Sequence, residues 1–122
     1  MLVHKHLIVR AEVTKPPVSP ALVRVWLTEL VESIGMKICN GPHVSYVDMP
    51  GNRGATGVVI IETSHCAIHE WDEPDPALIQ LDVYTCGPLD TQIIFDKLKE
   101  FNPVKIDYKY LDRETQLKEI PC

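Results

Sequence analysis

Hydrophobic residues recur with the helical period in two parts of the sequence. After Ser19 and Pro20, apolar residues are spaced three and four positions apart up to Gly35, at Val23, Trp26, Leu27, Leu30, Val31 and Ile34. Ser19 is a favourable N-cap and Pro20 suits the first helical position, so the pattern predicts an amphipathic helix that Gly35 ends. Asp90 is a favourable N-cap for a second helix, which we expect to end before Asn102. The side chains of this helix that would face the core are Ile94, Leu98 and Phe101.

The other hydrophobic residues lie in short segments that are typical of strands. Most of these segments alternate apolar and polar positions, and turn residues separate them. Residues 58–61, Val-Val-Ile-Ile, do not alternate and predict a central strand covered on both faces. A turn at Asn40-Gly41-Pro42 interrupts the second segment. The predicted strands are residues 2–13, 36–47, 58–61, 65–71, 78–84 and 104–110.

The predicted order is β-α-β-β-β-β-α-β. Helices are too few, and strands too often consecutive, for a doubly wound parallel sheet. We therefore expect an α+β fold, a two-layer sandwich of a mostly antiparallel sheet with two helices on one face. Residues 1–122 contain no internal repeat or linker and predict a single domain, with a polar tail over residues 112–122.

Composition and charge exclude several classes of partner. The chain has 17 acidic and 12 basic residues, a net charge of −5, and its basic residues are scattered, so nucleic acid is not expected as a partner. No apolar run is long enough to cross a membrane, and the first residues lack the apolar core of a signal peptide. We expect a cytoplasmic protein that does not bind membranes. The cysteines are widely spaced and predict no bridges: Cys39, Cys66, Cys86 and Cys122.

Chemically versatile side chains are densest in residues 63–73 and 82–87. His65 and His69 lie four positions apart and face one side of a strand, as two zinc ligands would, but Cys66 faces the other side. No spacing identifies the remaining ligands, so no metal is expected. A hydrolase triad is disfavoured as well, because Ser64 lacks the Gly-x-Ser-x-Gly elbow.

Ser64 fits a different use of serine. A serine hydroxyl can attack the carbonyl of the preceding residue and convert the peptide bond into an ester. Elimination and hydrolysis then leave a pyruvoyl group at the new chain end. By this chemistry the protein would cut itself and make its own electrophile.

Two stretches of this region resemble the small prokaryotic S-adenosylmethionine decarboxylases. Residues 57–73, GVVIIETSHCAIHEWDE, combine a valine-rich strand with Ser-His, Ile-His, Trp and Glu at the spacing of that family. Residues 81–87, LDVYTCG, match its Asp-x-x-Thr-Cys-Gly strand. The resemblance extends over most of the chain, including His6-Leu7-Ile8 and the helix after Gly87.

The resemblance implies a pyruvoyl-dependent decarboxylase of S-adenosylmethionine that serves polyamine (spermidine) synthesis. Cleavage between Thr63 and Ser64 would give a β chain, residues 1–63, and an α chain, residues 64–122, that begins with a pyruvoyl group made from Ser64. The substrate amine then condenses with this covalently bound ketone as a Schiff base. Neither a metal nor pyridoxal phosphate is implied.

The resemblance also implies the site residues. Cys86 is the proton donor and assists processing, His69 acts in the elimination step, and Thr56 stands where the family has a serine that supports processing. Glu73 would accept both ribose hydroxyls of the substrate, which suits the two oxygens of a carboxylate. Tyr46 is the candidate ring for stacking on adenine.

Ser64 and His69 are an odd number of residues apart, so a regular strand points them to opposite faces. The family's homodimers share their active sites between subunits, which removes this difficulty, and we expect the same here. Thr63 itself departs from the family, where glutamate is common before the serine. Two alternatives stay open: a pyruvoyl decarboxylase of a basic amino acid such as arginine or ornithine, and an uncut paralogue that only binds.

Overall fold

A computed structural model describes residues 3–122, so the predicted start of the first strand at Leu2 lies outside the described residues. Their elements follow the predicted order with one added strand. They are β1 (Lys5–Val13), α1 (Pro20–Ser33), β2 (Ile38–Val47), β3 (Gly54–Ile61), β4 (Ser64–Trp71), β5 (Ala77–Thr85), α2 (Thr91–Leu98), the 3-10 turn η1 (Lys99–Phe101), β6 (Pro103–Asp112) and β7 (Lys118–Glu119).

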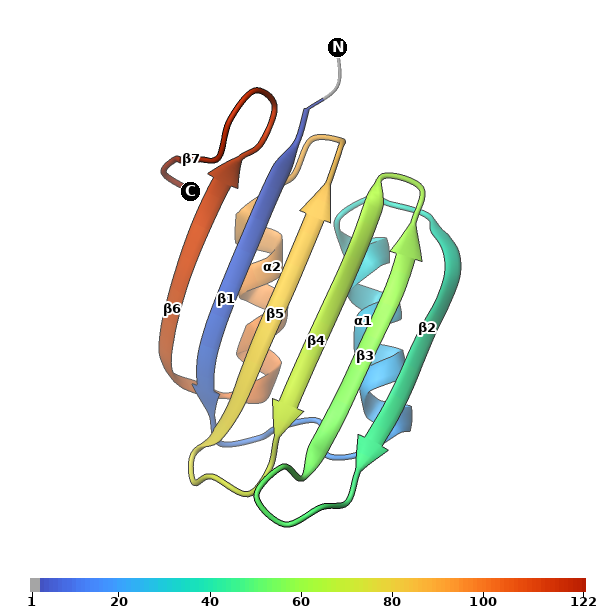
Figure 1. Ribbon diagram of the computed structural model, residues 1–122, viewed down its shortest axis with the longest axis vertical. Coiled ribbons are helices and arrows are strands. Elements are labelled where there is room, and N and C mark those ends of the chain that lie inside the picture. The colour runs from blue at the N-terminus through green and yellow to red at the C-terminus, as the bar shows by residue number, and fades with distance from the viewer. Residues whose placement is uncertain (1–2) are drawn as a thin grey trace.

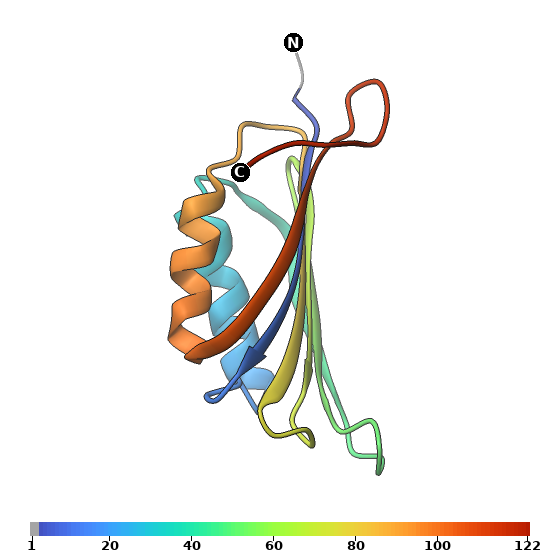
Figure 2. The same ribbon diagram turned by 90° about the vertical axis from the view of Figure 1, so that its left-hand side faces the viewer.

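The strands form one sheet in the order β2-β3-β4-β5-β1-β6-β7, and neighbouring strands are antiparallel. Strands β2 to β5 follow one another as hairpins, whereas β1 lies between β5 and β6 (Figure 1). Both α-helices pack on one face of the sheet (Figure 2). The structure confirms the predicted α+β fold with two layers and an antiparallel sheet.

The helices begin where their caps predict. The Ser19 hydroxyl accepts a hydrogen bond from the Leu22 amide at 3.2 Å, and the Asp90 carboxylate accepts one from the Gln92 amide at 3.0 Å. Gly35 follows α1 with a φ of 74°, in the left-handed region that ends many helices. Helix α1 approaches the sheet closely at Gly57, where a Cβ would lie 2.8 Å from Leu27 and Val23 side-chain atoms.

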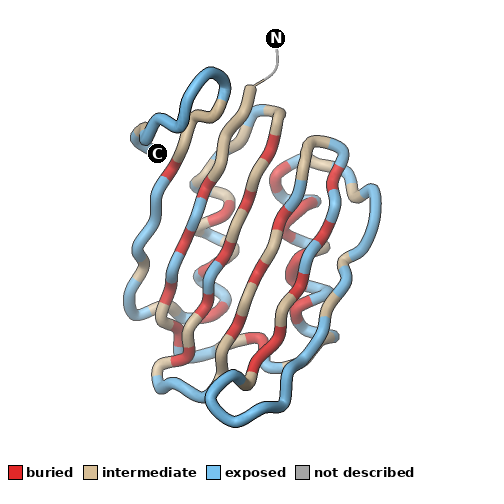
Figure 3. The backbone as a smooth tube through the Cα atoms, viewed as in Figure 1, coloured by how far each residue is buried: buried red, intermediate tan, exposed pale blue. Residues whose placement is uncertain are grey.

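The core lies between the helices and one face of the sheet, and Figure 3 shows buried and more exposed positions alternating along the strands. The opposite face, which we call the open face, carries no helix (Figure 2). Val58 and Ile60 of β3 point to it and are 43% and 50% exposed. The prediction that residues 58–61 are covered on both faces is therefore wrong for a single chain, because both helices pack on the same side.

Two segments differ from the predicted local structure. Residues 40–42 do not form a turn between two extended pieces, because they lie within β2, where the register with β3 shifts. Such irregularities bend a strand without ending it. The polar tail forms β7, and the Ile120 amide donates to the Tyr110 carbonyl at 2.8 Å. Local polarity did not reveal this pairing, which depends on β6.

Candidate functional site

The Thr63–Ser64 peptide bond lies in the tight hairpin between β3 and β4. Ile61 and Ser64 are paired across this hairpin, with Glu62 and Thr63 as its loop. Ser64 has a backbone φ of 137°, which residues other than glycine rarely adopt. A residue held in such a conformation stores on the order of 1–3 kcal/mol of backbone strain. The strain therefore lies directly beside the peptide bond that the sequence predicts to be cut.

The carbonyl of the same peptide bond is held by Cys86. The Cys86 amide donates to the Thr63 carbonyl oxygen at 2.6 Å. Strand β5 makes this contact possible, because Thr85 pairs with Ser64 and Cys86 follows directly. A donor at this oxygen polarises the carbonyl and stabilises negative charge that develops there. Three predicted residues, Thr63, Ser64 and Cys86, thus meet at one end of β4.

Thr56 and His69 meet at the other end of β4. They are paired across β3 and β4, and the Thr56 hydroxyl lies 3.1 Å from Nδ1 of His69. The His69 ring stacks on Trp71, with centroids 5.8 Å apart and planes 22° apart. Since the rings share the open face with Thr56, a hydroxyl, an imidazole and an indole form one surface there.

Ser64 and His69 do not meet within one chain. His69 follows Ser64 by five positions on β4, a separation of about 16 Å at the rise of a strand. Ser64 starts the series Ser64, Cys66, Ile68 that faces the helices, whereas His69 lies on the open face. The structure therefore divides the predicted catalytic residues between two ends of the sheet.

Glu73 lies just beyond the His69 end. Its carboxylate accepts a hydrogen bond from the Arg53 amide at 3.0 Å, and the Arg53 guanidinium lies 3.6 Å from the second oxygen. A cavity of about 370 Å³ adjoins Glu73, and its other lining residues are Gly51, Trp71, Pro74 and Leu78. The predicted ribose acceptor thus lies beside an apolar pocket with one aromatic wall.

Tyr46 lies at the same end but on the other face. It pairs with Ala55, whose side chain faces the helices, and its hydroxyl donates to Asp72 at 2.8 Å. That hydrogen bond to the carboxylate raises the pKa of Tyr46 to about 12. The aromatic ring that lines the cavity beside Glu73 is that of Trp71. The prediction that Tyr46 stacks on adenine depended on its position in the sequence, which does not reveal the face of the sheet to which its side chain points.

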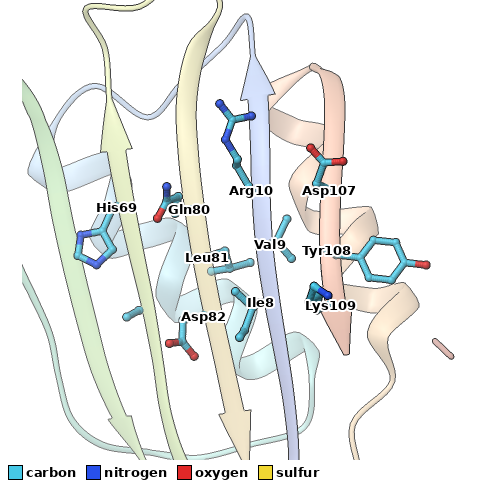
Figure 4. A pocket seen from close by; sticks show the side chains of 11 residues that line it. Ile8, Val9, Arg10, His69, Gln80, Leu81, Asp82, Asp107, Tyr108 and Lys109 are labelled. Carbon is cyan, nitrogen blue, oxygen red and sulfur yellow. The ribbon is translucent and has the colours of Figure 1, made fainter. Parts of the chain in front are cut away.

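A larger cavity of about 630 Å³ lies on the open face over β4, β5, β1 and β6. Figure 4 shows His69 and Gln80 along one side and Arg10, Asp107 and Lys109 along the other, with Asp82 and Ile8 below. The cavity connects His69 with the middle of the sheet. A single chain therefore leaves a wide hollow, lined by both apolar and charged side chains, on the face that no helix covers.

A polar cluster near the Ser64 end was not predicted. Asp82 is hydrogen-bonded to His6, and the His65 ring lies 3.9 Å from the same oxygen. Burial raises the pKa of Asp82, but the hydrogen bond from His6 and the nearby positive groups outweigh it, so this pKa lies below its usual value. Arg113 stacks on Tyr84, with its guanidinium carbon 4.1 Å from the ring centroid. The alternation of polar and apolar residues along β1, β4 and β5 was the one sequence signal that could have placed these side chains on the same face.

The sequence also did not single out Glu70 as a candidate residue. It is 2% exposed, and its Oε1 accepts a hydrogen bond from the Ala55 amide at 3.1 Å, while its Oε2 has no partner among residues 3–122. Burial raises the pKa of Glu70 to about 7, although the bond from Ala55 opposes the shift. This carboxyl supports the strand segment next to Thr56.

Other candidate chemistry is restricted by the structure. Burial raises the pKa of the Cys66 thiol to about 12, so it is a core residue and a poor nucleophile. Within residues 3–122 no three His, Cys, Asp or Glu side chains are placed to hold a metal ion. None of the helices described there has the length and apolar character to span a membrane.

Comparison with known proteins identifies the family of the chain. The profile of a family described as S-adenosylmethionine decarboxylase matches residues 5–114. The chain belongs to this family, which confirms the resemblance seen in residues 57–73 and 81–87.

Its relatives extend the comparison. The chain is 37% identical over 68 residues to an S-adenosylmethionine decarboxylase proenzyme of Picrophilus torridus, covering 54% of this chain and 51% of that protein. It is 41% identical over 65 residues to one of Persephonella marina, covering 52% and 47%. The chain therefore spans about half the length of these curated relatives in the aligned region.

A solved structure matches almost all of the chain. It is the adenosylmethionine decarboxylase from Aquifex aeolicus, with a TM-score of 0.72 and 25% sequence identity, over 99% of this chain and 98% of that one. The α+β fold is thus shared from end to end.

Proposed function

We propose that the chain is a proenzyme that cuts itself between Thr63 and Ser64 and then decarboxylates S-adenosylmethionine for polyamine synthesis. The observation that carries this proposal is the junction itself. Ser64 has a strained backbone, and the preceding carbonyl accepts a hydrogen bond of 2.6 Å from the Cys86 amide. Membership of the decarboxylase family supports the same conclusion.

Self-cleavage uses groups of this chain, a base from a second copy of it and one water molecule. The Ser64 hydroxyl oxygen bonds to the Thr63 carbonyl carbon, the bond from that carbon to the Ser64 nitrogen breaks, and the nitrogen takes the proton. The resulting ester loses the Ser64 α-proton and the Thr63 carboxylate, which leaves a dehydroalanine. This tautomerises to an imine, and water releases ammonia to leave the pyruvoyl group. His69 of a second chain is our candidate base for the elimination.

The mature site needs few other groups. A pyruvoyl group supplies a ketone that accepts the electrons released when a bound amino acid loses carbon dioxide. We assign the return of a proton to the Cys86 thiol, because the backbone amide of Cys86 contacts the Thr63 carbonyl oxygen beside the new chain end. Thr56 holds the His69 ring by the contact of 3.1 Å between their side chains, and Glu73 accepts the ribose hydroxyls in the cavity of about 370 Å³. Trp71, rather than Tyr46, supplies the aromatic wall for adenine.

A homodimer brings the two ends together. We propose that two open faces pack about a two-fold axis that runs across the strands, so the Ser64 end of each sheet lies over the His69 end of the other. Exposed apolar side chains on this face support the packing, among them Ile8, Val58 and Ile60. Each dimer then has two active sites, and each site takes residues from both chains.

The mass of the purified protein tests the proposal. Wild-type protein should give two chains, residues 1–63 and 64–122 with a pyruvoyl end, whereas Ser64→Ala should give one. Labelled carbon dioxide should then be released from S-adenosylmethionine and not from arginine or ornithine. An uncut wild-type chain favours the binding paralogue, and activity on the amino acids alone favours the other decarboxylase.

A further inference from the structure

The end of β5 forms a turn whose geometry depends on one buried hydroxyl. Thr85 is fully buried, and its Oγ1 accepts a hydrogen bond from the Gly87 amide at 3.0 Å. Cys86 is the residue between them. A threonine hydroxyl that bonds to the backbone two residues later stabilises a turn and fixes the direction of the intervening amide. That amide is the one that reaches the Thr63 carbonyl oxygen.

We propose that Thr85 is a positioning residue for self-cleavage and that the Cys86 backbone amide, which it directs, is the oxyanion donor of the first step. This inference builds on the self-cleavage proposed above. When the Ser64 oxygen bonds to the Thr63 carbon, the carbonyl electron pair moves onto the Thr63 oxygen. The amide at 2.6 Å from that oxygen stabilises the new charge. The charge returns to the carbonyl as the bond from carbon to nitrogen breaks and the proton passes to nitrogen, so no other reagent is needed.

Met36 holds both sides of this arrangement. The Thr63 hydroxyl donates to the Met36 sulfur at 2.9 Å, and the Thr85 hydroxyl lies 3.9 Å from the same atom. A Cβ built on Gly87 would lie 3.5 Å from both the Met36 methyl group and the Thr63 methyl group, so the turn packs against both residues. The carbonyl and its donor are therefore fixed relative to each other before the reaction begins, which is the condition for an effective oxyanion donor.

A backbone amide cannot be replaced by mutation, so the test acts through Thr85. Thr85→Val keeps the shape of the side chain and removes the acceptor of the Gly87 amide, whereas Thr85→Ser keeps the hydroxyl. The matched control is Thr28→Val on α1, whose hydroxyl bonds only to its own helix. Chain cleavage is followed by intact mass after rapid purification, and folding by circular dichroism.

We expect Thr85→Val to slow cleavage by about 10- to 100-fold, less than the roughly 100- to 1000-fold cost of losing an oxyanion donor, because the Cys86 amide is displaced and not removed. Thr85→Ser and Thr28→Val should cut at rates within about threefold of wild type. If Thr85→Val does not fold, Met36→Leu replaces it, because leucine fills the space and removes the sulfur acceptor. We expect that variant to cut several-fold more slowly.

Hydroxylamine identifies the step that is affected, because it cleaves esters and leaves peptide bonds intact. His69→Ala, blocked at elimination, should accumulate the ester and be cut by hydroxylamine, whereas Thr85→Val should resist because little ester forms. Cleavage of Thr85→Val at the wild-type rate, ester accumulation in that variant, or no recovery in Thr85→Ser would overturn the role of Thr85. If Met36→Leu is used instead, cleavage at the wild-type rate would overturn the role of Thr85. A wild-type chain that never cuts overturns the proposed function, and this inference with it.

Discussion

The two ends of β4, to which the proposed function assigns different steps, are built from different kinds of groups. At the Ser64 end the important groups belong largely to the backbone: a φ of 137° at Ser64, the Thr63 carbonyl and the Cys86 amide. At the His69 end they are side chains on the open face and beside it, held by contacts such as the one between Thr56 and His69. In the proposed reaction, bond breaking would therefore depend on local folding, whereas proton transfer and substrate recognition would depend on exposed side chains that a second chain can reach.

The largest effect on turnover should come from the thiol at the Ser64 end. In processed protein, Cys86→Ala should lower kcat by about 100-fold or more, the usual range for loss of a proton donor. KM should change by less than about threefold, because the proton is needed after substrate has bound. Steady-state kinetics on the mature protein measures both. Cys39→Ala, an exposed cysteine of β2, is the control, and an unchanged kcat in Cys86→Ala would contradict the assigned role.

Stability at the His69 end should depend on pH through Glu70. Its pKa is about 7 in the folded chain and 4.5 as a free side chain. The stabilisation linked to this raised pKa is fully present below pH 4.5 and is lost as the pH rises through 7, by up to about 3 kcal/mol. Urea unfolding between pH 4.5 and 8 measures this loss. Glu70→Gln should lack this component of the pH dependence, and an identical profile in the variant and the wild type would refute it.

Substrate recognition at the same end should depend on Glu73. Glu73→Gln should raise KM for S-adenosylmethionine by about 10- to 100-fold, because a hydrogen bond to a charged group contributes about 1.5–3 kcal/mol. Self-cleavage should proceed at the normal rate, since no ribose is bound at that stage. Asp75→Asn in the same loop is the matched control. A variant that fails to cut would show that Glu73 serves processing instead.

The smallest expected change in KM distinguishes Trp71 from Tyr46 as the ring that stacks on adenine. Trp71→Leu should raise KM by about five- to tenfold, at the lower end of the 1–3 kcal/mol that stacking on a base contributes. Tyr46→Leu should raise it by less than about twofold, because the Tyr46 side chain lies on the helix face of the sheet and does not line the cavity beside Glu73. Titration of both variants with substrate decides between them, and the reverse order would restore Tyr46 as the stacking ring.

The sequence predicted the elements well where local patterns decide the structure. Ser19 and Asp90 cap their helices, and the alternation in residues 65–71 and 78–84 matches the two faces of β4 and β5. It could not predict that β1 lies between β5 and β6, because strand order depends on distant pairings. Nor could it show that Val58 and Ile60 face solvent in a single chain. Their hydrophobicity indicates burial but does not show which surface would cover them.

The candidate site was predictable to a similar extent. Motif spacing selected Ser64, His69 and Cys86 as candidates, and strand parity predicted that Ser64 and His69 lie on opposite faces, which the structure confirms. The φ of Ser64 and the amide aimed at the Thr63 carbonyl leave no trace in the residue types. The cluster around Asp82 was missed because its members come from separate strands and the C-terminal segment, which only the folded sheet brings together.

Co-expression of two inactive chains tests most directly the claim that each site takes one end from each subunit. Ser64→Ala cannot be cut, and His69→Ala retains Ser64 but lacks the proposed base. In a mixed dimer, the His69→Ala chain meets His69 of the Ser64→Ala chain, so one complete site exists. With equal expression and random pairing, about half of the His69→Ala chains should be cut, as read from the masses of differently tagged chains. If these chains are cut no more than when expressed alone, the shared site is contradicted.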